Sequence, residues 1–208
     1  MSTAFLFPGQ GSQAVGMGAD LFAQFPEEVV QANDILGYSL SDLCVNGSEE
    51  QLGQTEYTQP ALYLVSYLHA RAISSDTEKP AMAAGHSVGE FAALAYAGVF
   101  SFSDGLKMVA KRGEIMSQVS GGGMAAVIAL DADKIKEVFA DKDLTGIDLA
   151  NFNSPGQIVI SGPATEISES LAPLKEAGAK LVVPLKVSGA FHSQMMEEPA
   201  QKFAEFLK

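Results

Sequence analysis

The sequence predicts an α/β protein with two units, and three patterns support this fold class. Short apolar runs at residues 3–7 and 80–84 are each closed by a turn sequence, as expected of buried strands. The second run leads into a sharp turn at residues 85–90 and then into a helical pattern through Ala97. Beyond the glycine-rich stretch 120–123, strand and helix patterns alternate. A chain of 208 residues with 47% apolar side chains is long enough for a large core and a smaller second one.

Residues 120–123, Ser-Gly-Gly-Gly, are predicted to be a linker, and the segment behind them has a pattern of its own. Its order of elements is strand, helix, strand, strand, helix, strand, at residues 124–130, 131–139, 147–151, 157–161, 165–176 and 179–185. This order is typical of a ferredoxin-like unit, in which two βαβ halves build one antiparallel sheet with both helices on one face. The unit interrupts the larger one, because the stretch at 187–193 and the helix expected at 194–207 have no place in it.

Between the first two strands the pattern is helical. Apolar residues in the segment 21–54 recur at helical spacing with several breaks, which favours short helices. Residues 59–73 predict a longer amphipathic helix with Pro60 in its first turn. A further helix carries Arg112, and Ser103-Asp104 is expected to cap it.

Ser87 lies at the centre of the sharp turn Gly85-His86-Ser87-Val88-Gly89-Glu90. Such a strand-turn-helix forces the serine into a strained backbone conformation, and the flanking glycines let strand and helix approach closely. The serine oxygen then lies at a helix N-terminus, where amide groups favour a developing negative charge, as acyl transfer requires. A glycine-serine turn that enters a helix without any chemistry is the alternative, and the short pattern by itself leaves both open.

The loop Gly9-Gln10-Gly11-Ser12-Gln13 is a second candidate for a site. Its glycines and the later ones at 16 and 18 lack the spacing of a dinucleotide-binding loop, and no second strand follows directly. A loop that brings backbone amides and either Gln10 or Gln13 toward a reacting oxygen fits better beside the serine turn.

The sequence holds three histidines. The side chain of His86 should point away from the neighbouring serine, and His69 falls within a predicted helix. By elimination His192 is the best base for Ser87, provided that the fold brings the two together. A structural histidine in a turn remains the alternative.

Arg112 also has two interpretations. It is either a surface cation, for instance the partner of Glu114, or a planar guanidinium that binds a carboxylate through two parallel hydrogen bonds. The residues alone favour the surface cation, because most arginines are exposed.

Composition excludes some functions. The net charge of −12, with basic residues scattered along the chain, opposes nonspecific nucleic-acid binding. No basic leader and no run as long as a membrane span is found, so we expect a soluble, cytoplasmic protein without a membrane partner. Cys44, the single cysteine, has no ligand neighbours at metal spacing, and we expect it to be a small core residue, with no metal site.

Four motifs occur in order: Pro8-Gly9-Gln10-Gly11-Ser12-Gln13, the serine turn 85–90, Lys111-Arg112-Gly113 and Gly189-Ala190-Phe191-His192-Ser193. Jointly, from residue 3 to the end of the chain, they resemble the malonyl-CoA:acyl carrier protein transacylase family. Within it the chain is most similar to the free-standing acyltransferases that serve polyketide synthases lacking their own acyltransferase domains.

The resemblance implies an α/β-hydrolase-like large subdomain, residues 1–122 and 187–208, with the ferredoxin-like small subdomain 123–186 inserted. Family members continue past this point with a strand, further helices and a residue that orients the histidine. The large subdomain is therefore expected to lack its C-terminal part here.

The resemblance also implies roles for the site residues. Ser87 would be the nucleophile and His192 its base. The backbone amides of Gln10 and Val88 would form the oxyanion hole. Arg112 would hold the malonyl carboxylate, which reverses the interpretation from the residues alone. In the family a bulky aromatic residue before the histidine goes with malonyl, so the aromatic side chain of residue 191, Phe191, indicates malonyl.

The implied activity is transfer of a malonyl group from malonyl-CoA to the phosphopantetheine thiol of an acyl carrier protein, through a malonyl-serine ester. No metal or redox cofactor is expected. Malonyl-CoA and an acyl carrier protein are the implied partners, in fatty-acid or polyketide biosynthesis. Two alternatives stay open: an acyl hydrolase that clears acyl groups from carrier proteins, and a noncatalytic scaffold that only docks them.

Overall fold

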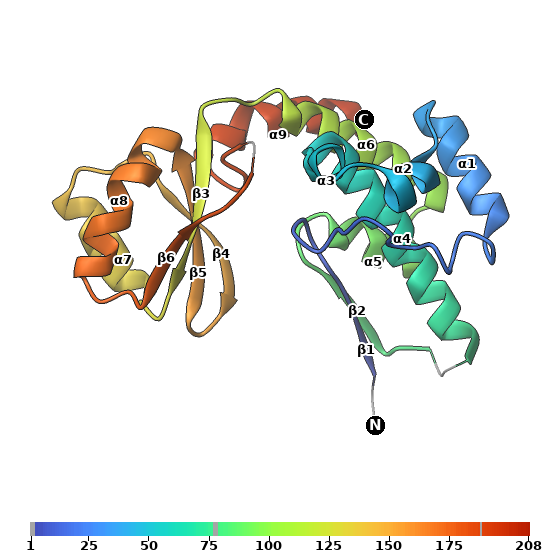
Figure 1. Cartoon of the computed structure of the whole chain (residues 1–208), viewed down its shortest axis with the longest axis horizontal. Coiled ribbons are helices and arrows are strands. Elements are labelled where there is room, and N and C mark those ends of the chain that lie inside the picture. Colours follow the sequence, from blue (N-terminus) through green and yellow to red (C-terminus); the bar gives the residue numbers. More distant parts are fainter. Residues whose placement is uncertain (1–2, 77–78, 188) are drawn as a thin grey trace. The chain divides into compact units, whose positions relative to one another are not determined.

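The computed structural model describes residues 3–76, 79–187 and 189–208 (Figure 1). The chain divides into two compact units, Met1–Glu114 and Ile115–Lys208. In the part of the chain that the structure describes, no helix is both long and apolar enough to cross a membrane.

The first unit combines two parallel strands with helices. Strands β1 (Ala4–Phe7) and β2 (Met82–Gly85) pair in parallel, so both short apolar runs form strands as predicted. The helices are α1 (Pro26–Leu36), α2 (Leu40–Asn46), α3 (Glu49–Gly53), α4 (Thr55–Asp76), α5 (Gly89–Tyr96) and α6 (Phe102–Ser117), the last of which runs on into the second unit.

Helix α4 lies at the centre of the first core. Its side chains Tyr63, Leu64 and Leu68 are fully buried. The helix begins four residues earlier than predicted, because the amides of Tyr57 and Thr58 already bond to the carbonyl of Gln54, at 2.9 and 2.8 Å. The prediction of Pro60 in the first turn is therefore wrong, and Pro60 lies inside the helix.

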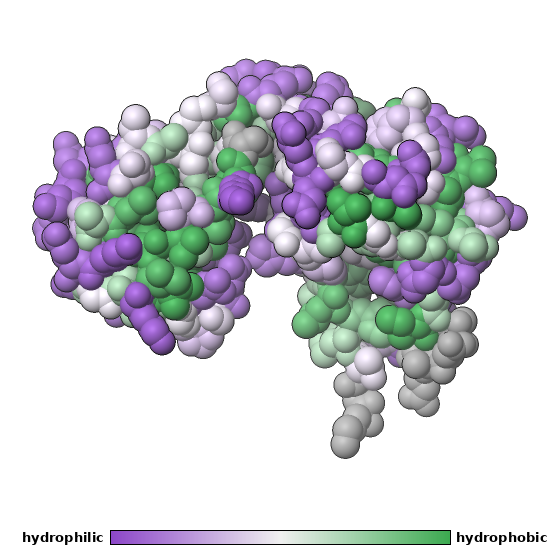
Figure 2. All heavy atoms as spheres, viewed as in Figure 1, coloured by the Kyte–Doolittle hydropathy of each residue, from purple (hydrophilic) through white to green (hydrophobic). Residues whose placement is uncertain are grey.

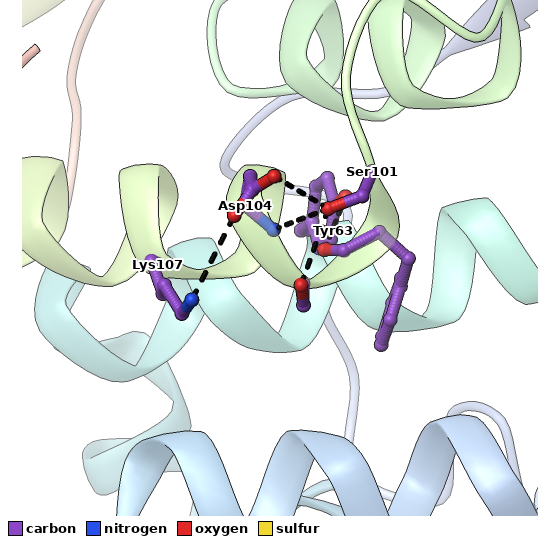
Figure 3. Close-up of polar contacts among 6 residues, drawn as sticks. Tyr63, Ser101, Asp104 and Lys107 are labelled. Atoms are coloured by element: carbon purple, nitrogen blue, oxygen red, sulfur yellow. Dashed lines mark hydrogen bonds and ion pairs between the residues drawn. The ribbon is translucent and has the colours of Figure 1, made fainter.

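The start of α6 differs from the prediction as well (Figure 3). Ser101, not Ser103-Asp104, caps the helix: its Oγ accepts from the amide of Asp104 at 3.1 Å and donates to the Asp104 carboxylate at 2.7 Å. The Tyr63 hydroxyl donates to the carbonyl of Phe102 at 2.9 Å, which ties the same turn to α4. These contacts fix the helix that carries Arg112.

The two-stranded sheet matters for the site because of where its strands end. Its flanks carry exposed apolar side chains, including Leu6 and Met82, and Figure 2 shows apolar atoms gathered over this sheet. In the parallel register Phe7 lies opposite Gly85, so both strands end at the same edge. The loops that follow, residues 8–13 and 86–88, leave the sheet side by side, which is where ligands bind in parallel sheets.

The second unit is built on an antiparallel sheet. Its strands are β3 (Gly122–Ile128), β4 (Asp148–Ser154), β5 (Gln157–Pro163) and β6 (Leu181–Pro184), in the spatial order β4-β5-β3-β6. Helices α7 (Ala132–Asp141) and α8 (Ala164–Glu176) complete the predicted order of strands and helices. Alternate residues of β3 point to opposite faces of the sheet. Ala125 and Val127 pack with α7 and α8 on one face, and Ala126 belongs to a smaller apolar cluster on the other.

The predicted linker is shorter in the structure. Gly122 and Gly123 belong to β3 and pair with Pro163 and Gly162, so the connection after α6 ends at residue 121. A Cβ at Gly122 would lie 2.3 Å from the amide nitrogen of Ala190. This glycine therefore permits a close approach of two backbone segments and does not belong to a flexible linker. The final helical stretch is also divided, into the 3-10 turn Gln194–Met196 and α9 (Glu197–Phe206).

Cys44 is buried in the first core, as expected of a small core residue. Burial raises the pKa of its thiol to about 12, because the thiolate would lose its hydration.

Candidate active site

The turn around Ser87 has the strained geometry that the sequence predicts. Ser87 has a φ of 51°, in the left-handed region that side chains with a Cβ rarely adopt. A Cβ at Gly85 would lie 2.1 Å from the amide nitrogen of Glu90, and one at Gly89 would lie 2.3 Å from the carbonyl oxygen of Phe7. Both glycines are therefore required for strand β2, helix α5 and strand β1 to meet at this point.

The loop after β1 lies directly against this turn. A Cβ at Gly9 would be 2.5 Å from the carbonyl oxygen of His86, so the two loops touch through their backbones. Gln13 folds back within its own loop, where its side chain accepts from the amide of Gly11 at 2.7 Å. The side chain of Gln10 instead reaches out of the loop and accepts from the hydroxyl of Thr55.

Arg112 of α6 reaches the serine. Its Nη2 donates to Ser87 Oγ at 3.2 Å, its Nη1 donates to Gln59 Oε1 at 2.6 Å, and the guanidinium lies 5.9 Å from the centre of the Phe91 ring. Arg112 is half-buried, so the interpretation as a solvated surface cation is wrong. Burial lowers the pKa of the guanidinium and the charge of Glu90 opposes that shift, but an arginine remains protonated at physiological pH.

A chain of hydrogen bonds connects Arg112 with the loop of Gln10. Gln59 Nε2 donates to Thr55 Oγ1 at 3.0 Å, and Thr55 Oγ1 donates to Gln10 Oε1 at 2.9 Å. Thr55 and Gln59 are neighbours on one face of α4, four residues apart, and each is 1% exposed.

Neither Thr55 nor Gln59 was singled out from the sequence as a site residue. The sequence predicts residue 59 only as the first residue of an amphipathic helix. The available signal was a Thr-x-x-x-Gln pair entering an apolar helix, since two polar residues on a buried face need partners.

His192 and Phe191 belong to the second unit. His192 is exposed and has a φ of 60°, in the left-handed region that few residues other than glycine adopt, although histidine is enriched among those that do. Phe191 is 6% exposed and packs with Met116, Met124 and Val159 in the smaller core of that unit. The structure thus brings Ser87, Arg112 and Gln10 into one network beside Val88, whereas the pairing of His192 with Ser87 stays a prediction.

The site in the first unit has a definite chemical character. A serine oxygen lies at the start of α5, where the helix dipole favours negative charge, and the half-buried cation of Arg112 lies next to it. Among the described residues no group of three or more His, Cys, Asp or Glu side chains is placed to hold a metal ion. The arrangement suits a serine that receives a group carrying a negative charge of its own.

Comparison with known proteins identifies a family of enzymes that transfer acyl groups. Residues 4–208 match the family model described as the acyl transferase domain. The polyketide biosynthesis protein ThaF of Burkholderia thailandensis is 53% identical over 98% of this chain, although the chain spans 18% of the length of ThaF. The polyketide biosynthesis malonyl CoA-acyl carrier protein transacylase PksC of Bacillus subtilis is 47% identical over 98% of this chain and 71% of PksC.

The solved structures that resemble this chain are also malonyl-transacylases. The malonyl CoA-acyl carrier protein transacylase of Burkholderia pseudomallei has a TM-score of 0.95 and 45% identity, over 100% of this chain and 71% of that one. The complex PlMCAT:AntF, a type II polyketide acyl-carrier protein with its malonyl-transacylase, has a TM-score of 0.93 and 38% identity, over 100% and 70%. The chain therefore belongs to the malonyl-CoA:acyl carrier protein transacylase family.

Proposed function

We propose that this chain transfers a malonyl group from malonyl-CoA to the phosphopantetheine thiol of an acyl carrier protein, with Ser87 as the acylated residue. The observation that carries the proposal is the contact between the Arg112 guanidinium and Ser87 Oγ, at 3.2 Å. In a malonyl-serine ester the free carboxylate lies three bonds from the serine oxygen, within reach of a cation that touches that oxygen.

In the first half-reaction Ser87 Oγ attacks the thioester carbon, and His192 takes the hydroxyl proton as general base. The carbonyl oxygen becomes an oxyanion, which the backbone amides of Gln10 and Val88 stabilise. The carbon–sulfur bond then breaks, and the CoA sulfur leaves as a thiol with the proton held by His192. A malonyl-serine ester remains.

In the second half-reaction the phosphopantetheine thiol of the carrier protein gives its proton to His192 and attacks the ester. The ester bond breaks, the proton returns to Ser87 Oγ and the malonyl thioester departs. Acyl transfer of this kind needs no electron acceptor, and the family uses malonyl-CoA as a substrate without a known cofactor. The names of PksC and of the PlMCAT:AntF complex support a carrier protein as acceptor.

Arg112 and Phe191 would select the acyl group. A partly buried guanidinium that has lost solvent gains most from a carboxylate and disfavours acyl groups that leave it unpaired. Phe191 would limit the size of the malonyl α-carbon substituent, as the aromatic residue before the histidine does in the family.

The two subdomains are proposed as an α/β-hydrolase-like part, residues 1–122 and 187–208, and an inserted ferredoxin-like part, residues 123–186. The antiparallel strand order β4-β5-β3-β6, with a helix after β3 and after β5, supports the second assignment. The strained serine between β2 and α5 supports the first.

Transfer to a carrier protein separates the proposal from its alternatives. With malonyl-CoA and a phosphopantetheine-loaded carrier protein, malonyl-carrier protein should accumulate much faster than free malonate, and Ser87→Ala should yield none. Faster release of malonate than transfer would favour the hydrolase. Carrier-protein binding without any acylation would favour the scaffold.

A further inference from the structure

We propose that Thr55 is a positioning residue that couples the carboxylate-binding side of the site to its oxyanion loop. The inference rests on the proposed roles of Ser87, Arg112 and Gln10. Thr55 would itself touch no substrate atom. It would act by holding Gln10 through its hydroxyl proton and Gln59 through its hydroxyl oxygen.

Arg112 fixes the donor and the acceptor of each hydrogen bond in the series that runs from Arg112 through Gln59 and Thr55 to Gln10. A guanidinium only donates, so the group of Gln59 that faces Arg112 must be its amide oxygen, Oε1. The amide nitrogen of Gln59 then points to Thr55 and occupies a lone pair of its hydroxyl. The hydroxyl proton is left to donate to Gln10. Hydrogen bonds aligned in one direction strengthen one another.

Because these side chains are buried, water cannot easily take the place of the hydrogen bonds that join them. Thr55 and Gln59 are each 1% exposed, and a buried polar group that loses its partner pays the cost of its lost hydration. Without the Thr55 hydroxyl, one N–H of Gln59 and the side-chain oxygen of Gln10 lose a partner. Gln59 would then rotate, and Arg112 would lose its orienting contact.

The backbone supports the same geometry. A Cβ at Gly113 would lie 2.9 Å from the carbonyl oxygen of Thr55 and 3.0 Å from the Cα of Glu56. The glycine after Arg112 therefore lets α6 approach the start of α4 at Thr55, one turn before Gln59. Arg112 reaches Gln59 because these two helices meet without a side chain between them.

Thr55→Val tests the proposal, because it keeps the shape of the side chain and removes the hydroxyl. Malonylation of Ser87 should fall by about tenfold to a hundredfold, the range expected when a reactive group is displaced by a fraction of an ångström to one ångström. Acetylation from acetyl-CoA should fall less, because it uses the oxyanion loop but not Arg112. Thr55→Ser keeps the hydroxyl and should retain the malonyl preference.

Thr58→Val is the matched control. Thr58 lies on the same helix, is 0% exposed and bonds through its hydroxyl to the carbonyls of Leu52 and Gln54, at 2.6 and 2.9 Å. It should lower the melting temperature as Thr55→Val does, but leave the ratio of malonyl to acetyl rates unchanged. The rates are followed by intact mass at a single turnover. Thr55→Ala provides the same test if the valine variant does not fold.

Coupling through Gln59 gives a second criterion. If Thr55 acts on Arg112 by way of Gln59, the double variant Thr55→Val/Gln59→Leu should show no greater loss of malonyl preference than Gln59→Leu alone. Wild-type acylation with an unchanged malonyl-to-acetyl ratio in both Thr55→Val and Thr55→Ala would overturn the role of Thr55. Absence of acylation in the wild-type protein would instead overturn the proposed function.

Discussion

Replacement of Arg112 tests how the site selects its acyl group. In the structure the guanidinium uses one Nη on Gln59 and the other on Ser87 Oγ, and the contact to Ser87, at 3.2 Å, is longer than an ideal hydrogen bond. A substrate carboxylate would compete for that nitrogen and for the remaining N–H groups. Arg112→Ala removes these donors together with the charge.

The expected loss follows from the number of contacts. Two charge-assisted hydrogen bonds to a carboxylate contribute about 1.5–3 kcal/mol each, and the contact given up to Ser87 offsets about 1 kcal/mol. The net effect on malonyl transfer is about 2–5 kcal/mol, or about 30-fold to several thousandfold in kcat/KM. Acetyl transfer lacks this interaction and should change far less. Arg112→Lys keeps the charge but lacks the two parallel N–H donors of the guanidinium, so it should lose part of the preference for malonyl over acetyl groups.

The assay compares kcat/KM for malonyl-CoA and acetyl-CoA in the wild-type protein and in each variant. Arg71→Ala is the control, because Arg71 is an exposed arginine that pairs with Glu28 and lies over the Phe25 ring. It should leave both rates unchanged. A malonyl-to-acetyl ratio in Arg112→Ala equal to that of the wild type would refute the assignment of Arg112 to the carboxylate.

Two further predictions concern the fold that supports the site. Gly89→Ala places a Cβ 2.3 Å from the carbonyl oxygen of Phe7, so it should lower the melting temperature and abolish acylation, whereas Gly156→Ala, with nothing within 4 Å, should do neither. The thiol of Cys44 has a pKa of about 12 in the folded state against 9.0 as the reference for the unfolded chain. The preference of the folded state for the protonated thiol stabilises the protein fully below pH 9. This stabilisation is lost as the pH rises from 9 toward 12, because the unfolded chain then releases the proton while the folded chain keeps it. In denaturant titrations the free energy of unfolding should fall by about 1.4 kcal/mol per pH unit in this range, a loss that Cys44→Ala lacks.

The parts of the fold that the sequence predicted are those that depend on local patterns. The turn at Ser87 was recognisable because strand, glycine, serine, glycine and helix follow one another within a few residues. The order of strands and helices after residue 121 was recognisable because each element is an apolar run bounded by turn residues.

What could not be predicted depends on contacts between distant residues. Gly122 and Gly123 have poor strand propensity, and the need for glycine at 122 arises from the backbone of Ala190. The burial of Arg112 likewise depends on Gly105 and Gly113. A Cβ at Gly105 would lie 2.2 Å from the Tyr63 hydroxyl oxygen, so the side chain of Tyr63 from α4 lies directly against the backbone of α6.

The hydrogen-bonded chain behind the site is nonlocal for the same reason. Thr55 and Gln10 are 45 residues apart in the sequence, and Arg112 and Gln59 are 53 apart. Neither spacing is a motif, so only the fold reveals that these polar side chains satisfy one another.

Intact-mass measurement after incubation with malonyl-CoA tests the central claim most directly. We predict that the wild-type chain gains the mass of one malonyl group, that peptide mapping places it on Ser87 and that Ser87→Ala gains none. An unmodified wild-type chain, or an equal adduct on Ser87→Ala, would contradict the assignment of Ser87 as the residue that carries the acyl group.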